Sequence, residues 1–424
     1  MTRVRGSAII ALLVAACALA AAHASAADPL NSSNRSSNRD RAQPDAHNEF
    51  NVVPVAGGTT DIGIGGGYFS GLAHLRPGYE PYEWNIESAA FLTFAPREGG
   101  GVVLPYQDFY LKFTVPRFFG SSIRIEIRPS YSWEAKLNYF GLGDTSNATL
   151  PPGAPHGYFT YGRLHPQLDV DLRGRIRDHL VARAGVRYTQ NWLQIADDSR
   201  LAQDLRTGND EVRGLLGSTS SHAVVAFNYG IQWDDRDNDV SAHRGTFDSV
   251  DVKLSPGGSA MFPYRYGQAT ATARIYIPIW KPRITLAARA VADVLYGTPP
   301  FYELARFEDT YAIGGLNGVR GVPGQRYYGK VKALGNVEVR TEIVSFHALG
   351  KPLLFGVVGF LDGGRVWADT SFRPELDGRR VGLKYGVGGG LRLQSGSAFV
   401  IRADVAWSPD ATPVGGYVAV GQMF

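Results

Sequence analysis

Hydrophobic and polar residues alternate with a period of two through most of the chain after about residue 50. The clearest case is Ile123–Arg128, in which isoleucine alternates with arginine and glutamate. The same alternation runs through 167–173, 268–277, 336–343 and 401–405. Successive side chains of a strand point to opposite faces, so each segment predicts a β-strand with one apolar and one polar face.

Extending this pattern to the turn residues between segments predicts sixteen strands. They lie near 50–57, 60–69, 84–95, 105–116, 121–134, 158–173, 179–191, 222–234, 246–256, 265–278, 283–296, 332–345, 353–366, 382–393, 398–407 and 415–424. Connections after even-numbered strands are mostly short, and those after odd-numbered strands include the long ones. The connection 70–83 is an exception, and 353–364 is apolar on both faces. An even strand count with short turns at one end is typical of an outer-membrane β-barrel.

The apolar segments also indicate how the strands close. Beyond the first 26 residues no apolar stretch reaches 18 residues, which excludes a helical membrane span. In water, these strands would suit a sandwich with one wet face. In a secreted chain they favour a closed barrel, because only closure satisfies every backbone group in hydrocarbon. The 51 glycines, 21 tyrosines, 21 phenylalanines and 7 tryptophans agree with this class.

The N-terminus predicts a secreted protein. Residues 1–26 combine a positive start at Arg3 and Arg5, a short apolar run and small residues suited to cleavage, which predicts a signal peptide. A lipoprotein signal ending at Cys17 is the competing interpretation. Residues 27–49 are polar and rich in Asn, Ser and Arg, so we expect a disordered leader. The barrel is then expected to occupy residues 50–424.

Charge and cysteine usage exclude several classes of protein. Of the 43 basic residues, two lie in the predicted signal, which leaves 41 against 39 acidic residues. So small a net charge predicts no nucleic-acid partner. The single cysteine also lies in the signal, so the mature chain has no thiol for disulfides or metal ligation.

A glycine-rich loop segment at 314–323 carries the most specific motif. Arg320 lies there between Val319 and Gly321, and two acids follow on later strands. Arginine forms strong, directional bonds to carboxylates in a poorly hydrated space. The alternative is an arginine in a solvated loop, with the two acids paired elsewhere. The residues expected to dock the loop inside the barrel are Val319, Arg320, Gly321, Glu338 and Asp362.

In this order, these segments resemble the BamA/TamA family of outer-membrane barrels, of the bacterial surface antigen type. The resemblance implies an all-β fold: a sixteen-stranded antiparallel transmembrane barrel whose sixth extracellular loop folds into the lumen. Its Val-Arg-Gly tip then pairs with acids on strands twelve and thirteen. The segments 138–146 and 233–245 resemble further family segments, and we expect the second to be a solvated turn rather than a metal site. Phe424, in phase with Val418 and Val420, resembles the C-terminal strand signal of outer-membrane proteins.

The resemblance also implies a function. Barrels of this family insert or translocate other proteins through a seam between the first and last strands, and glycines flank both of these strands here. About 25 residues separate the predicted signal from the first strand, too few for one POTRA domain, so we expect the chain to lack POTRA domains. The alternatives are a loop-plugged channel for small solutes and a structural surface-antigen barrel.

The remaining expectations concern chemistry and partners. Ser221 and His222 are the most tempting catalytic pair, but adjacent strand residues face opposite sides, so we expect no enzyme activity. We expect no cofactor and no bound metal. The expected partners are outer-membrane lipids and either unfolded outer-membrane clients or periplasmic proteins. A monomer in a Gram-negative outer membrane is predicted.

Overall fold

The computed structural model describes residues 46–424 except for 97–99, 218, 281–282, 308–309, 312, 349–350, 396–398 and 411–413. The predicted signal peptide and residues 27–45 of the predicted leader therefore lie outside the described residues.

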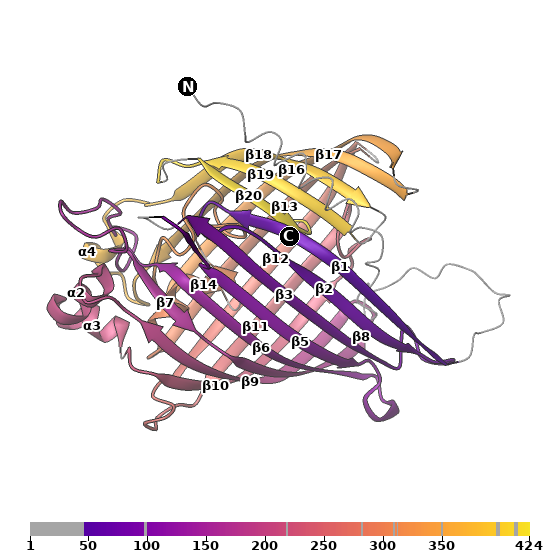
Figure 1. Ribbon diagram of the computed structural model, residues 1–424, viewed down its shortest axis with the longest axis horizontal. Helices are drawn as coiled ribbons and strands as arrows, with labels where there is room; N and C mark the ends of the chain where they lie inside the picture. The colour runs from indigo at the N-terminus through magenta and orange to yellow at the C-terminus, as the bar shows by residue number, and fades with distance from the viewer. Residues whose placement is uncertain are drawn as a thin grey trace.

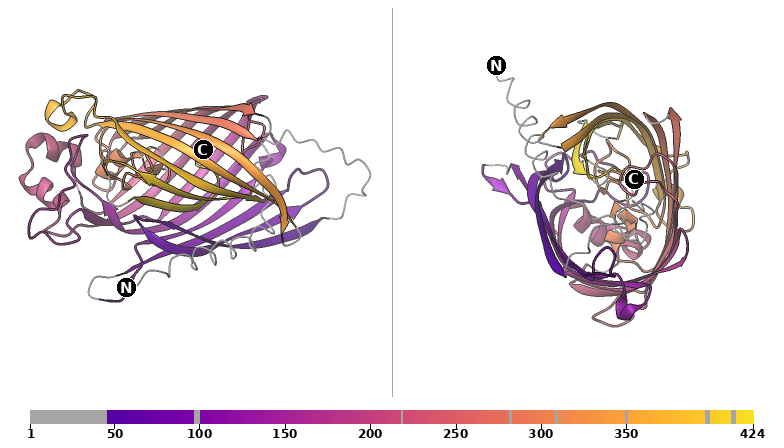
Figure 2. Two further views of the ribbon diagram at one scale, coloured as in Figure 1. Left: turned by 90° about the horizontal axis from the view of Figure 1, so that it is seen from above. Right: turned by 90° about the vertical axis from the view of Figure 1, so that its right-hand side faces the viewer.

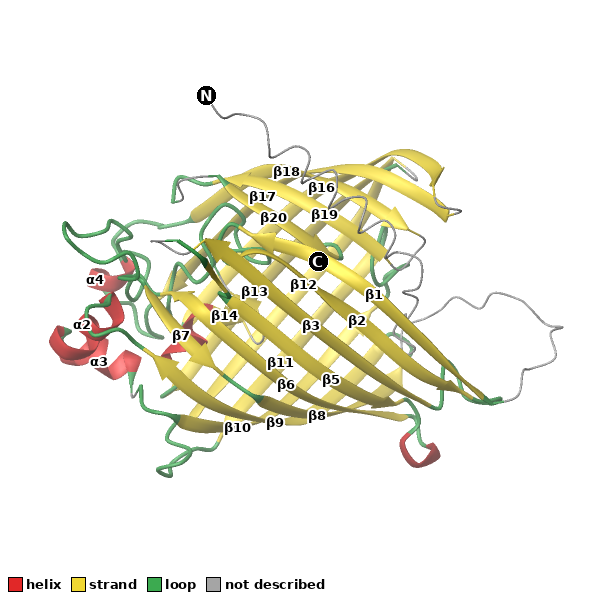
Figure 3. Cartoon of the chain, in the orientation of Figure 1, coloured by secondary structure: helices red, strands yellow, loops and turns green. Residues whose placement is uncertain are grey.

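Antiparallel strands form one closed wall, seen from the side in Figure 3 and end-on in Figure 2. Its strands are β1 (His47–Thr59), β2 (Gly63–Leu75), β3 (Trp84–Pro96), β4 (Val102–Val103), β5 (Tyr106–Val115), β6 (Ile123–Asn138), β7 (Thr160–Leu164), β8 (Gln167–Arg177), β9 (Leu180–Gln194), β10 (His222–Asp234), β11 (Gly245–Ser255), β12 (Tyr266–Trp280), β13 (Ile284–Gly297), β16 (Val331–Ala348), β17 (Lys351–Trp367), β18 (Lys384–Ser395), β19 (Phe399–Trp407) and β20 (Gly415–Val420). β4 pairs with the end of β3 and leads into β5, so β4 and β5 are parts of one strand, and β7 and β8 both lie between β6 and β9 as two parts of one strand. The wall therefore has sixteen strands, which confirms the predicted fold class.

Short elements complete the chain in the connections between barrel strands. They are η1 (Phe118–Gly120), α2 (Arg200–Thr207), α3 (Asp210–Leu216), η2 (Phe301–Ala305), β14 (Arg306–Phe307), β15 (Thr310–Tyr311) and α4 (Pro374–Asp377). The long loops gather at one end of the barrel with α2, α3 and α4, on the left in Figure 1. Among the described residues, no helix is long and apolar enough to cross a membrane.

The two faces of the wall follow the alternation in the sequence. On β16, Lys332 and Glu338 point inward and are buried, whereas Val337 and Val339 point outward and are exposed. Charged lumen residues pair with one another; for example, Lys332 Nζ lies 2.6 Å from Asp293 Oδ1. The apolar side chains therefore face the lipid, and the polar ones are neutralised inside.

Several strand boundaries differ from the sequence prediction, and β1 begins at His47 rather than at residue 50, so the last three residues of the predicted leader belong to the barrel. The predicted strand 158–173 is divided at Pro166, because proline has no backbone N–H to donate to the ladder. β2 continues to Leu75, so the next turn is shorter than predicted. β20 ends at Val420 rather than at residue 424.

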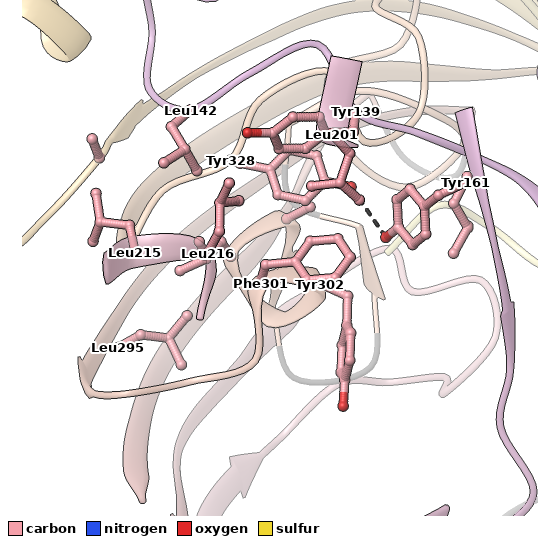
Figure 4. Close-up of a cluster of buried hydrophobic side chains, with 14 of the residues drawn as sticks. Tyr139, Leu142, Tyr161, Leu201, Leu215, Leu216, Leu295, Phe301, Tyr302 and Tyr328 are labelled. Atoms are coloured by element: carbon pink, nitrogen blue, oxygen red, sulfur yellow. Dashed lines mark hydrogen bonds between the residues drawn. The ribbon is translucent and has the colours of Figure 1, made fainter. Parts of the chain in front are cut away.

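A cluster of buried aromatic and leucine side chains packs the loops together at the long-loop end (Figure 4). Phe301 and Tyr328 come from the connection between β13 and β16, while Leu216 comes from α3. The hydroxyls of Tyr161 and Tyr328 lie 3.3 Å apart. This cluster ties the outer loops to the segment that fills the lumen.

Candidate functional site

The described residues of the connection between β13 and β16 (298–307, 310–311 and 313–330) lie within the barrel rather than projecting from it. The first part of this connection docks on the wall built by β6 and β11. Glu303 Oε2 lies 3.3 Å from Lys253 Nζ. Arg306 Nη2 donates to Glu134 Oε2 at 3.0 Å. These charge-assisted contacts fix one side of the loop to the lumen.

The tip of the same loop reaches the opposite wall at Arg320, which is 0% exposed. Its Nε and Nη2 donate to the two oxygens of Asp362 at 2.8 and 3.0 Å. Its Nη1 donates to Glu338 Oε1 at 2.7 Å. The structure thus brings together the arginine and the two acids singled out in the sequence, and β16 and β17 supply the acids.

The two neighbours of Arg320 shape the tip. Val319 is fully buried in a cluster with Val322 and Val366. Gly321 has φ +93°, a backbone conformation that L side chains rarely adopt, and a Cβ there would press on the backbone at Trp407. This glycine therefore permits both the turn and the close approach to the wall.

Several contacts to Arg320 were not identified from the sequence. Asp404 Oδ2 on β19 accepts from Arg320 Nη1 at 3.2 Å, and the guanidinium lies 3.4 Å from the centre of the Phe360 ring. A Cβ at Gly386 on β18 would collide with the Arg320 carbonyl oxygen. Alternation indicated that Asp404 faces the lumen, but it did not indicate which lumen acid lies at the depth of the loop tip.

The docked loop also explains why both faces of β17 are apolar. Its inward residues Phe360 and Val366 are buried, Val366 together with loop residues Val319 and Val322. The lumen face of β17 is therefore covered by protein rather than by water, so apolar residues suit it.

The barrel closes at a short seam between β1 and β20. The register covers only Gly58 with Val418 and Thr59 with Tyr417, and one further bond runs from the Thr60 N–H to the Gly416 oxygen at 3.1 Å. By contrast, β1 pairs with β2 along its whole length.

Glycines on β1 and β2 allow close approach to the neighbouring strands at and beside the seam. A Cβ at Gly57 would lie 2.8 Å from the Val418 oxygen, and Cβ atoms at Gly65 and Gly67 would collide with backbone oxygens of β3. Glycine is therefore needed at these positions of β1 and β2 because the neighbouring backbone lies too close for a Cβ atom. The sequence suggested only that glycines leave this region short of packing side chains.

The chain turns inward after β20. Gly421 has φ +88°, and the Phe424 ring lies 6.5 Å from that of Tyr276 inside the lumen. Arg340 Nη2 donates to the Phe424 backbone oxygen at 2.8 Å. Figure 2 (right) shows the C-terminus within the ring of strands. Phe424 therefore lies in the lumen beyond the end of β20, and the prediction that the last strand reaches residue 424 is wrong.

Two contacts join the seam to the lumen loop. The Gly321 N–H donates to the Tyr417 hydroxyl on β20 at 2.9 Å. The Gly324 N–H donates to Asp61, in the turn between β1 and β2, at 3.2 Å. Burial raises the pKa of Asp61 to about 6, although the Gly324 N–H acts in the opposite direction. β20 and the turn that follows β1 thus contact the loop near its tip.

A cavity of about 780 Å³ lies beside these contacts. It is bounded by β1, β20, the wall strands β3 to β6 and the lumen loop. Its polar lining includes Asp108, Arg128 and Lys136. The loop therefore leaves a polar space on the β1 side of the lumen.

The other candidates from the sequence, His222 and the segments 233–245 and 138–146, make contacts of a structural kind. Both ring nitrogens of His222 have neighbours, at 2.7 Å from the Ser220 oxygen and 2.8 Å from the Tyr302 hydroxyl. The 233–245 segment is a turn in which Asp237 accepts from the His243 backbone N–H at 2.9 Å. Within the 138–146 segment, the Gly143 N–H donates to the Tyr328 oxygen at 2.8 Å, so this segment packs on the lumen loop.

A sixteen-stranded wall with an apolar exterior, a charged lumen and an internal loop defines a bacterial outer-membrane β-barrel. The Omp85 superfamily domain matches residues 105–422. The chain therefore belongs to the Omp85 superfamily, which confirms the resemblance to BamA/TamA-type barrels.

Solved structures share this fold. BamA from Haemophilus ducreyi lacking POTRA domains 1–3 matches with a TM-score of 0.56 at 13% identity, over 88% of this chain and 70% of that one. CdiB from Escherichia coli matches with a TM-score of 0.55 at 15% identity, over 90% and 64%. CdiB from Acinetobacter baumannii matches with a TM-score of 0.50 at 15% identity, over 88% and 59%. The chain thus spans less than two thirds of either CdiB chain. No curated protein matches the sequence.

Proposed function

We propose that this barrel inserts or translocates proteins at the outer membrane, and that an extended client segment meets it at the seam between β1 and β20. The observation that carries the proposal is the short seam register, which covers only Gly58 and Thr59 on β1. The function implied by the BamA/TamA resemblance supports it.

A strand edge offers main-chain donors and acceptors to an incoming strand. Within the described part of the chain, residues 48–55 of β1 pair with β2 and with no other strand. Opening the seam breaks few ladder bonds, each contributing a net of about 1 kcal/mol. A client strand that restores such bonds therefore offsets the cost of opening.

We assign Val319, Arg320, Gly321, Glu338 and Asp362 the role of docking the lumen loop. Removing one partner of a buried ion cluster leaves uncompensated charge, so this docking is sensitive to single substitutions. Because Gly321 donates to Tyr417 on β20, a displaced loop also removes a contact from the seam strand.

The first experiment measures the folding rate of an unfolded outer-membrane client in liposomes that contain this barrel. Wild type should accelerate folding over empty liposomes, and Arg320→Ala should weaken the acceleration. If wild type gives the same rate as empty liposomes, the insertase proposal is wrong.

A disulfide across the seam tests where the client acts. A Cβ at Gly416 lies 3.8 Å from Thr60 Cγ2, so the Thr60→Cys/Gly416→Cys pair suits disulfide geometry. Oxidation of this pair should abolish the acceleration, and reduction should restore it. The matched control joins β16 to β17 through Val337→Cys/Leu361→Cys, a register pair on the outer face, and should have no effect. A locked seam that still accelerates folding would exclude this route.

A loop-plugged channel for small solutes is the second candidate. The cavity of about 780 Å³ beside the loop favours it, because removing the loop would join this polar space to the rest of the lumen. Deleting 312–328 should then produce a large rise in single-channel conductance. The absence of such a rise would argue against a plugged channel, whereas a structural surface-antigen barrel would show neither activity.

The mature form and its partners belong to the same proposal. We propose that residues 1–26 are cleaved as a signal peptide, that the barrel is a monomer, and that periplasmic proteins deliver clients to it. Intact-mass measurement of protein purified from the outer membrane tests the cleavage and distinguishes it from lipidation at Cys17.

A further inference from the structure

The outer wall of the barrel carries an apolar groove of about 1000 Å³ across β10 to β17. This volume is at the upper end of the range for ligand sites, about 300–1,000 Å³. Outer-membrane barrels have short turns at the periplasmic end and long loops at the extracellular end. Trp233 borders the groove at the short-turn, periplasmic end of β10, and Trp367 borders it at the long-loop, extracellular end of β17. Its floor consists of small, outward-facing residues: Ala271, Ala273, Ala290, Ala292 and Gly335. The groove therefore crosses the apolar band between its two aromatic boundaries.

The charges at the two ends of the groove differ. Val381 and Leu383 line the extracellular end, and directly before them in the chain stand Arg379 and Arg380, both exposed. Neither guanidinium has a hydrogen bond or ion pair within the residues that the structure describes. At the periplasmic end, the lining includes Asp248. The groove is thus positive toward the outer leaflet and negative toward the inner one.

We propose that this groove binds a phosphate-bearing anionic lipid of the outer leaflet. Its acyl chains lie along the small-residue floor, where the absence of large side chains allows close approach. Its phosphate is held by Arg379 and Arg380, because guanidinium groups match phosphate geometry. Asp248 repels an anionic headgroup from the inner leaflet, so the charges select the leaflet. The site lies on the outer face and is independent of the proposed function.

The test measures lipid retention by the purified full-length barrel in a neutral detergent, using native mass spectrometry. The probes are phosphatidylglycerol and phosphatidylcholine with identical acyl chains, and inorganic phosphate. Wild type should retain phosphatidylglycerol in preference to phosphatidylcholine, and inorganic phosphate should not displace it. Arg379→Ala/Arg380→Ala should weaken phosphatidylglycerol binding roughly thirtyfold, because each basic residue near an anionic lipid contributes about fivefold.

Two further variants separate the groove from general charge. Arg244→Ala/Arg283→Ala removes two exposed arginines from the periplasmic turns, and should leave retention unchanged. Ala292→Phe fills the floor and should weaken phosphatidylglycerol binding with both groove arginines intact. Circular dichroism establishes that each variant is folded.

Three results would overturn the proposal. The first is equal retention of both lipids by wild type, which indicates ordinary annular lipid. The second is an equal loss in the periplasmic double variant, which indicates nonspecific charge attraction. The third is a wild-type dimer that Ala292→Phe dissociates, which assigns the groove to a second copy of the chain.

Discussion

The wall between β16 and β17 and the seam between β1 and β20 are opposite extremes of the same barrel. β16 and β17 pair from Val331 with Trp367 down to Ala348 with Lys351. The seam register covers two residue pairs. The backbone hydrogen bonds are therefore spread unevenly around the barrel. Opening costs the least free energy at the strand pair with the fewest hydrogen bonds.

The lumen loop connects these two regions. Arg320 binds acids on β16, β17 and β19, whereas the next residue, Gly321, donates to Tyr417 on β20. The loop is therefore fixed on the long-paired wall by ion pairs, and it contacts the seam through single backbone hydrogen bonds to Tyr417 and Asp61. This difference predicts that substitutions on the wall side have larger effects than those on the seam side.

Arg320→Ala should produce the largest effect. It leaves three buried carboxylates without their shared cation, and should lower the free energy of unfolding by about 3–5 kcal/mol. Urea unfolding in lipid vesicles, followed by tryptophan fluorescence, measures it. Arg213→Ala, which removes a surface ion pair with Asp210, is the control and should cost less than about 1 kcal/mol. Equal losses would show that the loop tip contributes no more than a surface charge.

Gly386→Ala should displace the loop without removing a charge. The added Cβ collides with the Arg320 backbone oxygen, and such overpacking costs about 1–3 kcal/mol. The measurement is the rate of trypsin cleavage within 314–328, which should rise. Gly359→Ala is the control, because a Cβ there meets no atom within 4 Å. Unchanged cleavage in Gly386→Ala would contradict the tight approach of loop and wall.

Tyr417→Phe tests the contact between the lumen loop and the seam strand β20. It leaves the Gly321 N–H without its acceptor, at a cost of about 1–2 kcal/mol. Hydrogen exchange of the Gly321 and Thr60 amides should accelerate about tenfold. The exposed Tyr385 on β18 provides the control, Tyr385→Phe. Faster exchange at Gly321 alone would show that the loop and the seam are not coupled.

Asp61→Asn should give the smallest effect and a pH dependence. The pKa of Asp61 is raised from 3.8 to about 6, so the folded barrel favours the protonated form. Stability from this group is fully present below pH 3.8 and is lost as the pH rises toward 6. Because Asn stays neutral, the variant should be more stable than wild type by about 1 kcal/mol at pH 8 and equal to it at pH 3.5. Unfolding curves at the two pH values measure this, and a pH-independent difference would exclude a buried charge.

Much of the fold was predictable because a barrel in lipid repeats one local rule. Segments such as Ile123–Arg128 alternate because each strand has one face in hydrocarbon and one in the lumen, so strand count and facing could be read along the chain. The alternation did not predict the structure correctly at two positions. Pro166 interrupts a strand, and Phe424 leaves the strand pattern for the lumen.

The strands, their faces and the arginine and acids that meet at the loop tip follow from residue type and from spacing within short segments of the chain. The tertiary structure was needed to show which lumen acid completes the cluster, why β17 is apolar inside, and how few residues close the seam. Asp404 lies 84 residues after Arg320 in the chain, and Val418 lies 360 residues after Gly58. Such contacts follow from barrel closure and depth in the lumen, which no local pattern specifies.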